Sequence, residues 1–282
     1  MFATIHTHTI YTPPLGTDTV VLDLGAYRGE FAQEMSARYG GTYYLVEANP
    51  VLAEALRVEG RFPVWPCAVA ETEGLVPFHI AHNDTGSSLL TLPRESVYNC
   101  VLRETIQVQA RQLESLLAEF RAPRIDLLKM DIEGAEVGIL RSLSRATLRA
   151  IGQITVEFHS DPVFGFDLRR EVEEVIRSLQ RQGFLCLDFS GRARLDVLFV
   201  NRAIHRIPRL QRVLWQWQTT PPVLARRPWA STPPMFKEQD TADAGVGDRP
   251  EVPYWTSPSV KGALGVVAAP KKVRSRRRSW QC

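Results

Sequence analysis

Short apolar runs alternate with amphipathic stretches along the front part of the chain. Runs typical of buried strands occupy residues 19–24, 43–47, 64–69, 125–131 and 154–159. Apolar positions with helical spacing follow at residues 29–39, 50–59, 113–120, 135–143 and 168–182. Two late strands are expected at residues 184–189 and 196–201. Strands that alternate with helices this often predict an α/β fold with a doubly wound, mostly parallel sheet.

Two further segments, residues 76–81 and 106–110, alternate between apolar and polar positions. This pattern predicts either a hairpin or an additional edge strand. In doubly wound sheets, ligands bind outside the carboxyl ends of the strands. The residues that directly follow each strand are therefore the candidates for chemistry.

Composition places the chain among ordinary globular proteins. It has 282 residues, of which 44% are hydrophobic and 23% are charged, so it can bury a core without disulfide or metal support. The four cysteines have no CxxC spacing that would indicate a zinc knuckle or a dithiol redox motif. The sequence shows neither a leader segment nor an apolar run of the roughly 18 residues that a membrane span needs. We expect a cytoplasmic protein.

Charge is distributed unevenly along the chain. Residues 1–202 carry a net charge of −6 and residues 203–282 carry +9, which together give the overall +3. Five of the six tryptophans and ten of the 19 prolines also lie after residue 202. We therefore expect an N-terminal extension over residues 1–18, a folded domain over 19–202, and a basic, Pro/Trp-rich and largely disordered tail over 203–282. Trp215 and Trp217 could still pack back on the domain within a short helix.

The first strand ends in Asp23-Leu24-Gly25-Ala26-Tyr27-Arg28-Gly29, a turn that leads directly into a helix. Its glycine spacing differs from the G-x-G-x-x-G fingerprint of dinucleotide-binding proteins. The carboxylate of Asp23 would repel a pyrophosphate but suits a cationic nucleoside without phosphate, such as S-adenosylmethionine (SAM). The alternative is a tight turn that binds no ligand.

Glu47 ends the second strand and follows Gly25 by 22 residues. In dinucleotide folds, an acid about 20 residues after the glycine turn binds the ribose hydroxyls. The alternative for Glu47 is an exposed acid that precedes the helix beginning at Asn49-Pro50.

The fourth and fifth strands carry the strongest chemical signals. Lys129 and Asp131 share one face of their strand, since residues two apart point the same way, and Glu157 and His159 do the same. We expect Asp131, Glu157 and His159 to converge over neighbouring strand ends, where His159 could accept a hydroxyl proton. The three could instead ligate a divalent metal, although no ligand spacing supports one. Glu133 and Glu136 could be purely structural acids at a helix N-terminus.

From Thr19 to Asn201 the sequence resembles the FkbM-type methyltransferases, which belong to the SAM-dependent, Rossmann-like class. The segments that carry the resemblance are residues 21–29, 46–50, 83–89, 126–136 and 156–159. The resemblance implies a seven-stranded sheet with a reversed last strand. It also implies methyl transfer from SAM to a hydroxyl of a sugar, a polyketide or another small metabolite. Two features depart from the family: Ala48 and Asn49 separate Glu47 from Pro50, and the tail has no counterpart.

Carried over by position, the resemblance implies that Asp23, Gly25 and Gly29 line the methionine end of SAM, with Glu47 on the ribose. We expect the cofactor to be bound by Asp23, Gly25, Tyr27, Arg28, Gly29, Glu47, Ala68 and Ser87. The catalytic candidates are Asp131, His159, Glu157 and Lys129. Asp131 or His159 would serve as the base, and Lys129 would do so if burial lowers its pKa.

Three other functions remain open. The basic tail with its tryptophans could direct the enzyme to RNA, but the acidic front part argues against a broad nucleic-acid surface. A non-catalytic protein could have kept the fold. A nicotinamide-dependent oxidoreductase is disfavoured by the missing G-x-G-x-x-G.

Overall fold

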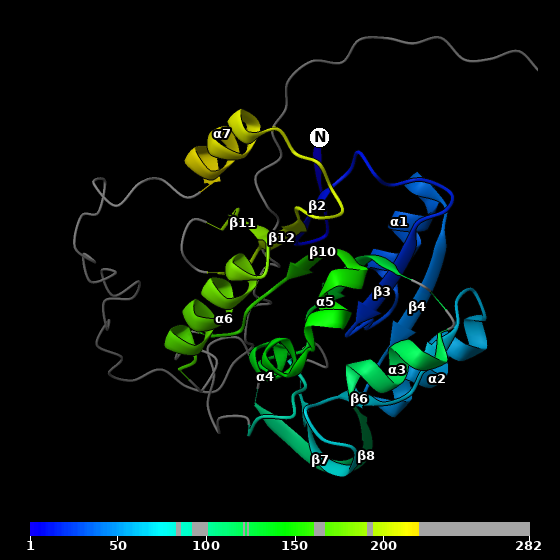
Figure 1. The fold of residues 1–282 in the computed structure, drawn as a ribbon. Coiled ribbons are helices and arrows are strands. Elements are labelled where there is room, and N and C mark those ends of the chain that lie inside the picture. Colours follow the sequence, from blue (N-terminus) through cyan, green and yellow to red (C-terminus); the bar gives the residue numbers. More distant parts are fainter. Residues whose placement is uncertain are drawn as a thin grey trace, which may run out of the picture. The chain divides into compact units, whose positions relative to one another are not determined.

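The computed structural model describes residues 1–82, 86–91, 101–120, 122, 124–160, 167–190 and 194–219 (Figure 1). These residues belong to one compact unit, which spans Met1–Arg227. The expectations for residues 83–85 and for the tail beyond residue 219 lie outside the described residues.

The core of this unit is a seven-stranded sheet with the strand order β11-β12-β10-β9-β3-β4-β5. The strands are β3 (Val20–Leu24), β4 (Thr42–Val46), β5 (Val64–Trp65), β9 (Ile125–Met130), β10 (Ile151–Val156), β11 (Phe184–Asp188) and β12 (Val197–Asn201). All neighbours pair in parallel except β12, which is antiparallel to both β10 and β11. The predicted α/β fold with a mostly parallel sheet is confirmed. Chain order reverses between β3 and β9, where ligands bind in such sheets.

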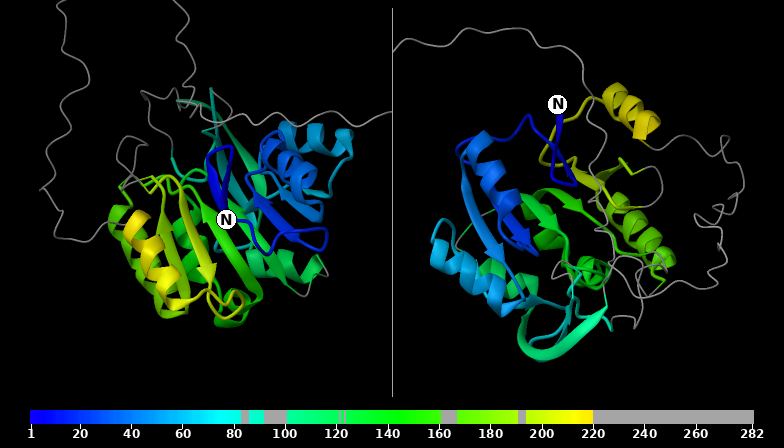
Figure 2. Two further views of the ribbon diagram at one scale, coloured as in Figure 1. Left: turned by 90° about the horizontal axis from the view of Figure 1, so that it is seen from above. Right: turned by 180° about the vertical axis from the view of Figure 1, so that it is seen from behind.

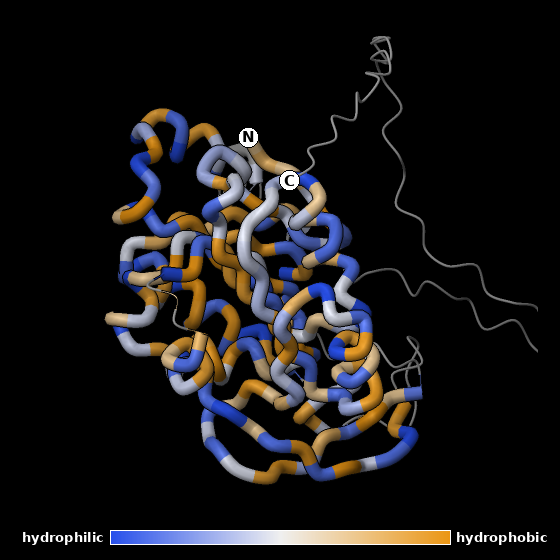
Figure 3. The backbone as a smooth tube through the Cα atoms, turned by 90° about the vertical axis from the view of Figure 1, so that its right-hand side faces the viewer, coloured by the Kyte–Doolittle hydropathy of each residue, from blue (hydrophilic) through white to orange (hydrophobic). Residues whose placement is uncertain are grey.

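Helices cover both faces of the sheet (Figures 1 and 2). One face packs against α3 (Leu113–Glu119), α4 (Glu136–Ser142), α5 (Arg145–Ala150) and α6 (Arg169–Arg181). The other packs against α1 (Glu30–Tyr39), α2 (Pro50–Glu59), α7 (Arg209–Thr219) and the hairpin formed by β1 (Phe2–Ile5) and β2 (His8–Tyr11). The inner strands β9 and β10 are buried at every residue. Figure 3 shows hydrophobic segments running through the interior of the described unit. Burial on both faces explains why these strands are continuous apolar runs.

The segment predicted as one strand over residues 64–69 is divided at Pro66, so that prediction was wrong. Proline has no backbone N–H to donate to a sheet, and Cys67 N bonds the carbonyl of Trp65 at 3.0 Å in a turn. β5 therefore stays in the main sheet, whereas β6 (Ala68–Val69) joins a second sheet of order β6-β8-β7. In that sheet β7 (Gly74–Ala81) and β8 (Leu102–Arg111) form the hairpin that the alternating pattern allowed.

Both flanks of the predicted domain pack onto the sheet. The side-chain oxygen of Gln153 accepts a hydrogen bond from Tyr11 N at 2.8 Å, and its amide donates to Tyr11 O at 3.0 Å. At the other end of the chain, Trp215 on α7 is 7% exposed, and its ring lies 4.8 Å from that of Phe2. The hairpin and α7 thus extend the packed structure beyond residues 19–202. No helix among the described residues is long and apolar enough to span a membrane.

Candidate active site

The turn after β3 brings the ends of β3, β4 and β9 into close contact. Gly25 and Ala26 donate backbone hydrogen bonds to Val46 O, at 3.0 and 3.1 Å. Gly25 has a φ of +74°, and a Cβ at this position would lie 1.8 Å from the carbonyl oxygen of Asp131. Only glycine fits both the dihedral angle and the space. The turn therefore depends on Gly25 irrespective of any ligand.

Glu47 connects this turn to the start of α2. Its Oε2 accepts a hydrogen bond from Tyr27 N, and its Oε1 accepts one from Asn49 N, both at 2.8 Å. Burial raises the pKa of Glu47 in spite of these two bonds. Each carboxylate oxygen can accept a second hydrogen bond, so Glu47 retains acceptor capacity toward a ligand. The alternative of an exposed acid ahead of a helix is wrong, because Glu47 is buried.

A pocket opens between this turn, the second sheet and the loop after β9. Apolar side chains form one wall, namely Ala48, Leu52, Val69, Phe78 and Leu89. Glu47, Asp131 and Glu133 contribute carboxylates to it. The structure brings five of the predicted cofactor residues to the pocket: Gly25, Tyr27, Glu47, Ala68 and Ser87.

The other three predicted cofactor residues do not line the pocket. The guanidinium of exposed Arg28 lies 5.1 Å from the centroid of the Tyr27 ring. Gly29 is the N-cap of α1, where a Cβ would lie 3.0 Å from Leu56 Cδ2, so it serves helix packing. Asp23 is 0% exposed, beneath the glycine turn.

Asp23 forms a buried ion pair with Lys129. Lys129 Nζ lies 3.2 Å from Asp23 Oδ1 and 3.7 Å from Asp131 Oδ2, and it donates to Gly25 O at 2.7 Å. Burial would lower the pKa of Lys129, but the carboxylates of Asp23 and Asp131 outweigh it and the pKa is raised. Lys129 therefore stays a cation, which corrects its assignment as a potential base. It holds β3, β9 and the glycine turn together.

Acidic side chains surround His159 at the ends of β9 and β10. Its Nε2 lies 3.3 Å from Glu133 Oε2, 3.7 Å from Glu157 Oε1 and 3.9 Å from Asp131 Oδ1. Its Nδ1 lies 3.3 Å from Glu136 Oε1. The structure thus brings Asp131, Glu157 and His159 together, as the strand positions predict.

The pKa values of His159, Asp131 and Glu133 indicate which of these side chains can accept a proton. Burial opposes the charge on His159, yet the surrounding carboxylates hold its pKa well above the ordinary value of 6.5. Burial likewise opposes ionisation of Asp131, but Lys129, His8 and His159 hold its pKa far below its usual range. Burial raises the pKa of Glu133 to about 8. A base works best with a pKa near the operating pH, so Glu133 suits proton acceptance better than Asp131 or His159.

Glu136 orders the loop that carries Glu133. Its carboxylate accepts hydrogen bonds from Ile132 N and Gly134 N at 3.1 Å, which supports the structural alternative for this residue. Glu133 itself has a φ of +55°, unusual for a residue with a side chain, and its carbonyl accepts a 2.5 Å bond from Ser88 Oγ. The loop thus holds the Glu133 carboxyl against the pocket.

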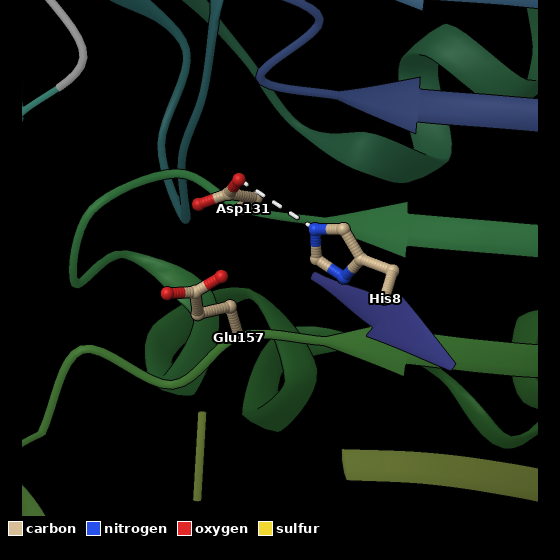
Figure 4. A group of neighbouring side chains, drawn as sticks. All are labelled: His8, Asp131 and Glu157. Atoms are coloured by element: carbon tan, nitrogen blue, oxygen red, sulfur yellow. Dashed lines mark ion pairs between the residues drawn. The ribbon is translucent and has the colours of Figure 1, made fainter. Parts of the chain in front are cut away.

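His8 was missed by sequence reasoning. It lies on β2, far away in sequence, yet its Nε2 is 3.5 Å from Asp131 Oδ2 (Figure 4). The adjacent Thr7 donates a 2.9 Å hydrogen bond from Oγ1 to Glu157 Oε2. The alternation His6-Thr7-His8-Thr9 is the one local signal, and it does not specify which part of the sheet the hairpin covers.

The fold and the site define a doubly wound α/β protein with an acid-lined ligand pocket at the point where strand order reverses. The chain belongs to the FkbM methyltransferase family: the model of the methyltransferase FkbM domain matches residues 23–186. The resemblance read from the sequence is confirmed.

Among curated proteins, a stretch of 75 residues is 35% identical to the AMB antimetabolite synthetase AmbE of Pseudomonas aeruginosa, covering 26% of this chain and 4% of that protein. The match therefore spans a small part of that relative's length.

Among solved structures, a precorrin-6y C5,15-methyltransferase from Geobacter metallireducens is 12% identical, with 66% of this chain and 80% of that chain covered and a TM-score of 0.33. A putative O-methyltransferase from Klebsiella pneumoniae is 16% identical, with 65% and 73% covered and a TM-score of 0.34.

Proposed function

We propose that the chain transfers the methyl group of SAM to a hydroxyl oxygen of a small molecule. Family membership establishes the methyltransferase class, and the donor and the type of acceptor are our inference. The observation that carries it is the position of the Glu47 carboxylate, which is held by two backbone N–H groups beside the glycine turn and lines the pocket.

The residues of the pocket fit SAM. Glu47 has the acceptor capacity to bind ribose hydroxyls, and the apolar wall around Leu52 and Phe78 suits an adenine ring. Asp131 and Glu133 give the opposite end the negative charge that favours a sulfonium cation. Among the described residues that line the pocket, none is lysine or arginine, which disfavours cofactors with a pyrophosphate.

SAM, when bound, supplies a methyl group on a good leaving group. The chain's own contribution is to align the acceptor, exclude water and remove the hydroxyl proton; alignment of this kind is worth about 7–11 kcal/mol. Glu133 accepts the proton at its carboxylate. His159, 3.3 Å away and positively charged, stabilises the ionised form of Glu133 that acts as the base. Asp131 keeps Lys129 and His159 in place through its own charge.

The acidic surroundings also bear on the acceptor. Asp131, Glu133 and Glu157 lie within 4 Å of His159, so the region carries more acids than bases. This favours a neutral or cationic acceptor over the phosphates of an RNA. It supports a small-molecule acceptor over the RNA-directed alternative.

Calorimetric titration of the full chain with SAM tests the proposal, with NAD as the control ligand. We expect the wild type to bind SAM with micromolar affinity and not to bind NAD. Glu47→Ala should weaken the affinity for SAM at least tenfold. Glu54→Ala, on the solvent side of α2, is the matched control and should bind normally, since its side chain is 67% exposed. Formation of S-adenosylhomocysteine with hydroxylated compounds then identifies the acceptor. A folded wild-type chain that binds no SAM would overturn the proposal.

A further inference from the structure

Three side chains from separate segments meet beside the pocket. His8 comes from β2, Asp131 follows β9 and Glu157 follows β10 (Figure 4). Each offers one ligand atom, and these atoms all lie within 4.8 Å of one another. Donors around a single ion about 2.1 Å away lie roughly 3–4 Å apart, so small rotations of the side chains would enclose an ion.

The imidazole of His8 is buried without a hydrogen-bond partner among the residues that the structure describes. The residue is 1% exposed, and neither ring nitrogen makes a hydrogen bond within the described part of the chain. Its Nε2 faces Asp131 Oδ2 at 3.5 Å, and the ring packs edge-on against Phe31. Burying a polar nitrogen without a partner is costly, and native proteins rarely leave one in this state. The Nε2 of His8 thus has only this 3.5 Å approach to Asp131, and a cation between the ring and the carboxylates would give it a closer ligand contact.

We propose that His8, Asp131 and Glu157 bind one divalent transition-metal ion of the Mn²⁺ type. Two carboxylate oxygens and one imidazole nitrogen form a mixed donor set, which suits such ions better than Mg²⁺ or Ca²⁺, whose ligands are oxygens. Glu157 is already oriented, because its Oε2 accepts the hydrogen bond of Thr7 and its Oε1 faces His159 Nε2 at 3.7 Å. Support of this kind around a ligand is typical of metal sites.

His8 is a better metal ligand here than His159. Both ring nitrogens of His159 face carboxylates, and its Nδ1 is hydrogen-bonded to Glu136. The two histidines also approach different oxygens of Asp131: His159 lies nearer Oδ1 and His8 nearer Oδ2. Oδ2 also faces Lys129 Nζ at 3.7 Å, so an ion bound to Oδ2 would take the place of this longer ion pair while Oδ1 remains paired with His159.

The ion would lie at the edge of the pocket, since Asp131 is one of its lining residues. Three protein ligands leave coordination positions open, and an acceptor hydroxyl bound at one of them would lose its proton more readily. This role in activating the acceptor rests on the proposed function. The binding of the ion itself is independent of the proposed function.

The test is titration of the chelator-treated full chain with Mn²⁺, followed by calorimetry and by the electron paramagnetic resonance signal of free Mn²⁺. We expect one ion per chain, bound at least tenfold more tightly than Mg²⁺. His8→Gln and Glu157→Gln should each weaken binding at least tenfold. His6→Gln is the matched control, because His6 lies two residues away on the same hairpin with its side chain 45% exposed.

SAM titration of the same samples separates this proposal from the proposed function. A His8→Gln chain that loses Mn²⁺ but still binds SAM is folded and supports the metal site. If removal of His8 impairs folding, Glu157→Gln provides the same test, because its side chain is partly exposed and its replacement should disturb the fold less. A wild-type chain that binds SAM but not millimolar Mn²⁺ would overturn the metal site alone. Equal Mn²⁺ binding by the wild type and both variants, or tighter binding of Mg²⁺, would overturn it as well.

Discussion

Gly25 lies against the backbone of Asp131 so closely that a single added methyl group would meet the Asp131 carbonyl oxygen at 1.8 Å. This contact joins the turn after β3 to the strand end that carries the candidate catalytic acids. The packing of two backbones thus sets the geometry between the glycine turn and Asp131.

Gly25→Ala should therefore destabilise the protein strongly. The positive φ alone costs about 1 kcal/mol, and displacement of the Asp131 backbone adds to it, so we expect a loss of at least about 3 kcal/mol in the free energy of unfolding. Denaturant titration measures it. Gly60→Ala is the control: it has a φ of +68° but no atom nearer than 3.8 Å, so about 1 kcal/mol is expected. Equal losses in both variants would contradict the close contact.

Lys129→Met should cost about 3–5 kcal/mol of stability, because it leaves the fully buried Asp23 without a counter-charge. The double variant Asp23→Leu/Lys129→Met removes both charges and should recover most of this loss. Chemical denaturation of the wild type and the variants provides the comparison. Additive losses would show that the two side chains do not act as a pair.

Methyl transfer should become faster as the pH rises toward 8, because Glu133 must be ionised to accept a proton and burial raises its pKa to about 8. Glu133→Gln should lower the rate about 10²–10⁴-fold and remove this rise in the pH profile. SAM affinity is measured alongside to separate binding from chemistry. A Glu133→Gln enzyme with an unchanged profile would exclude Glu133 as the base.

Glu133 should also make stability depend on pH. Its pKa in the folded state, about 8, lies above the ordinary value of 4.5. Between pH 4.5 and pH 8, Glu133 therefore keeps its proton in the folded protein but has lost it in the unfolded chain. The stabilisation is complete below pH 4.5 and is lost as the pH rises to about 8, by at most about 1.4 kcal/mol per pH unit.

Glu133→Gln removes this contribution, so the variant should gain stability relative to the wild type between pH 5 and pH 8. Thermal unfolding of both proteins across this range measures the difference. Glu54→Gln, on the surface of α2, should follow the wild type. A constant difference between Glu133→Gln and the wild type would refute the raised pKa.

Trp215→Ala should destabilise the protein by about 3–5 kcal/mol, because the indole packs against Phe2 and Tyr11 beneath α7. Leu210→Ala on the same helix is 73% exposed and should change stability by less than about 0.5 kcal/mol. Thermal unfolding decides whether α7 is part of the fold. A Trp215→Ala variant with unchanged stability would support the predicted domain boundary at residue 202.

The local sequence pattern determined the class of fold and the strand faces that carry the candidate side chains. Period-two alternation placed Lys129 with Asp131 and Glu157 with His159 on common faces, and the order of strands and helices predicted the doubly wound sheet. Both follow from the sequence because the direction of a side chain in a strand depends on its immediate neighbours. The division at Pro66 also has a local cause, the missing N–H of proline, but the apolar pattern predicted one continuous strand over residues 64–69.

The tertiary structure alone decided how the site is completed and charged. His8 reaches Asp131 because the hairpin folds across the sheet, a long-range packing that no local pattern specifies. The cationic state of Lys129 and the raised pKa of Glu133 depend on burial and on charges from distant segments. Such effects act through space, between residues that only the folded chain brings together, and they moved the candidate base from His159 or Asp131 to Glu133.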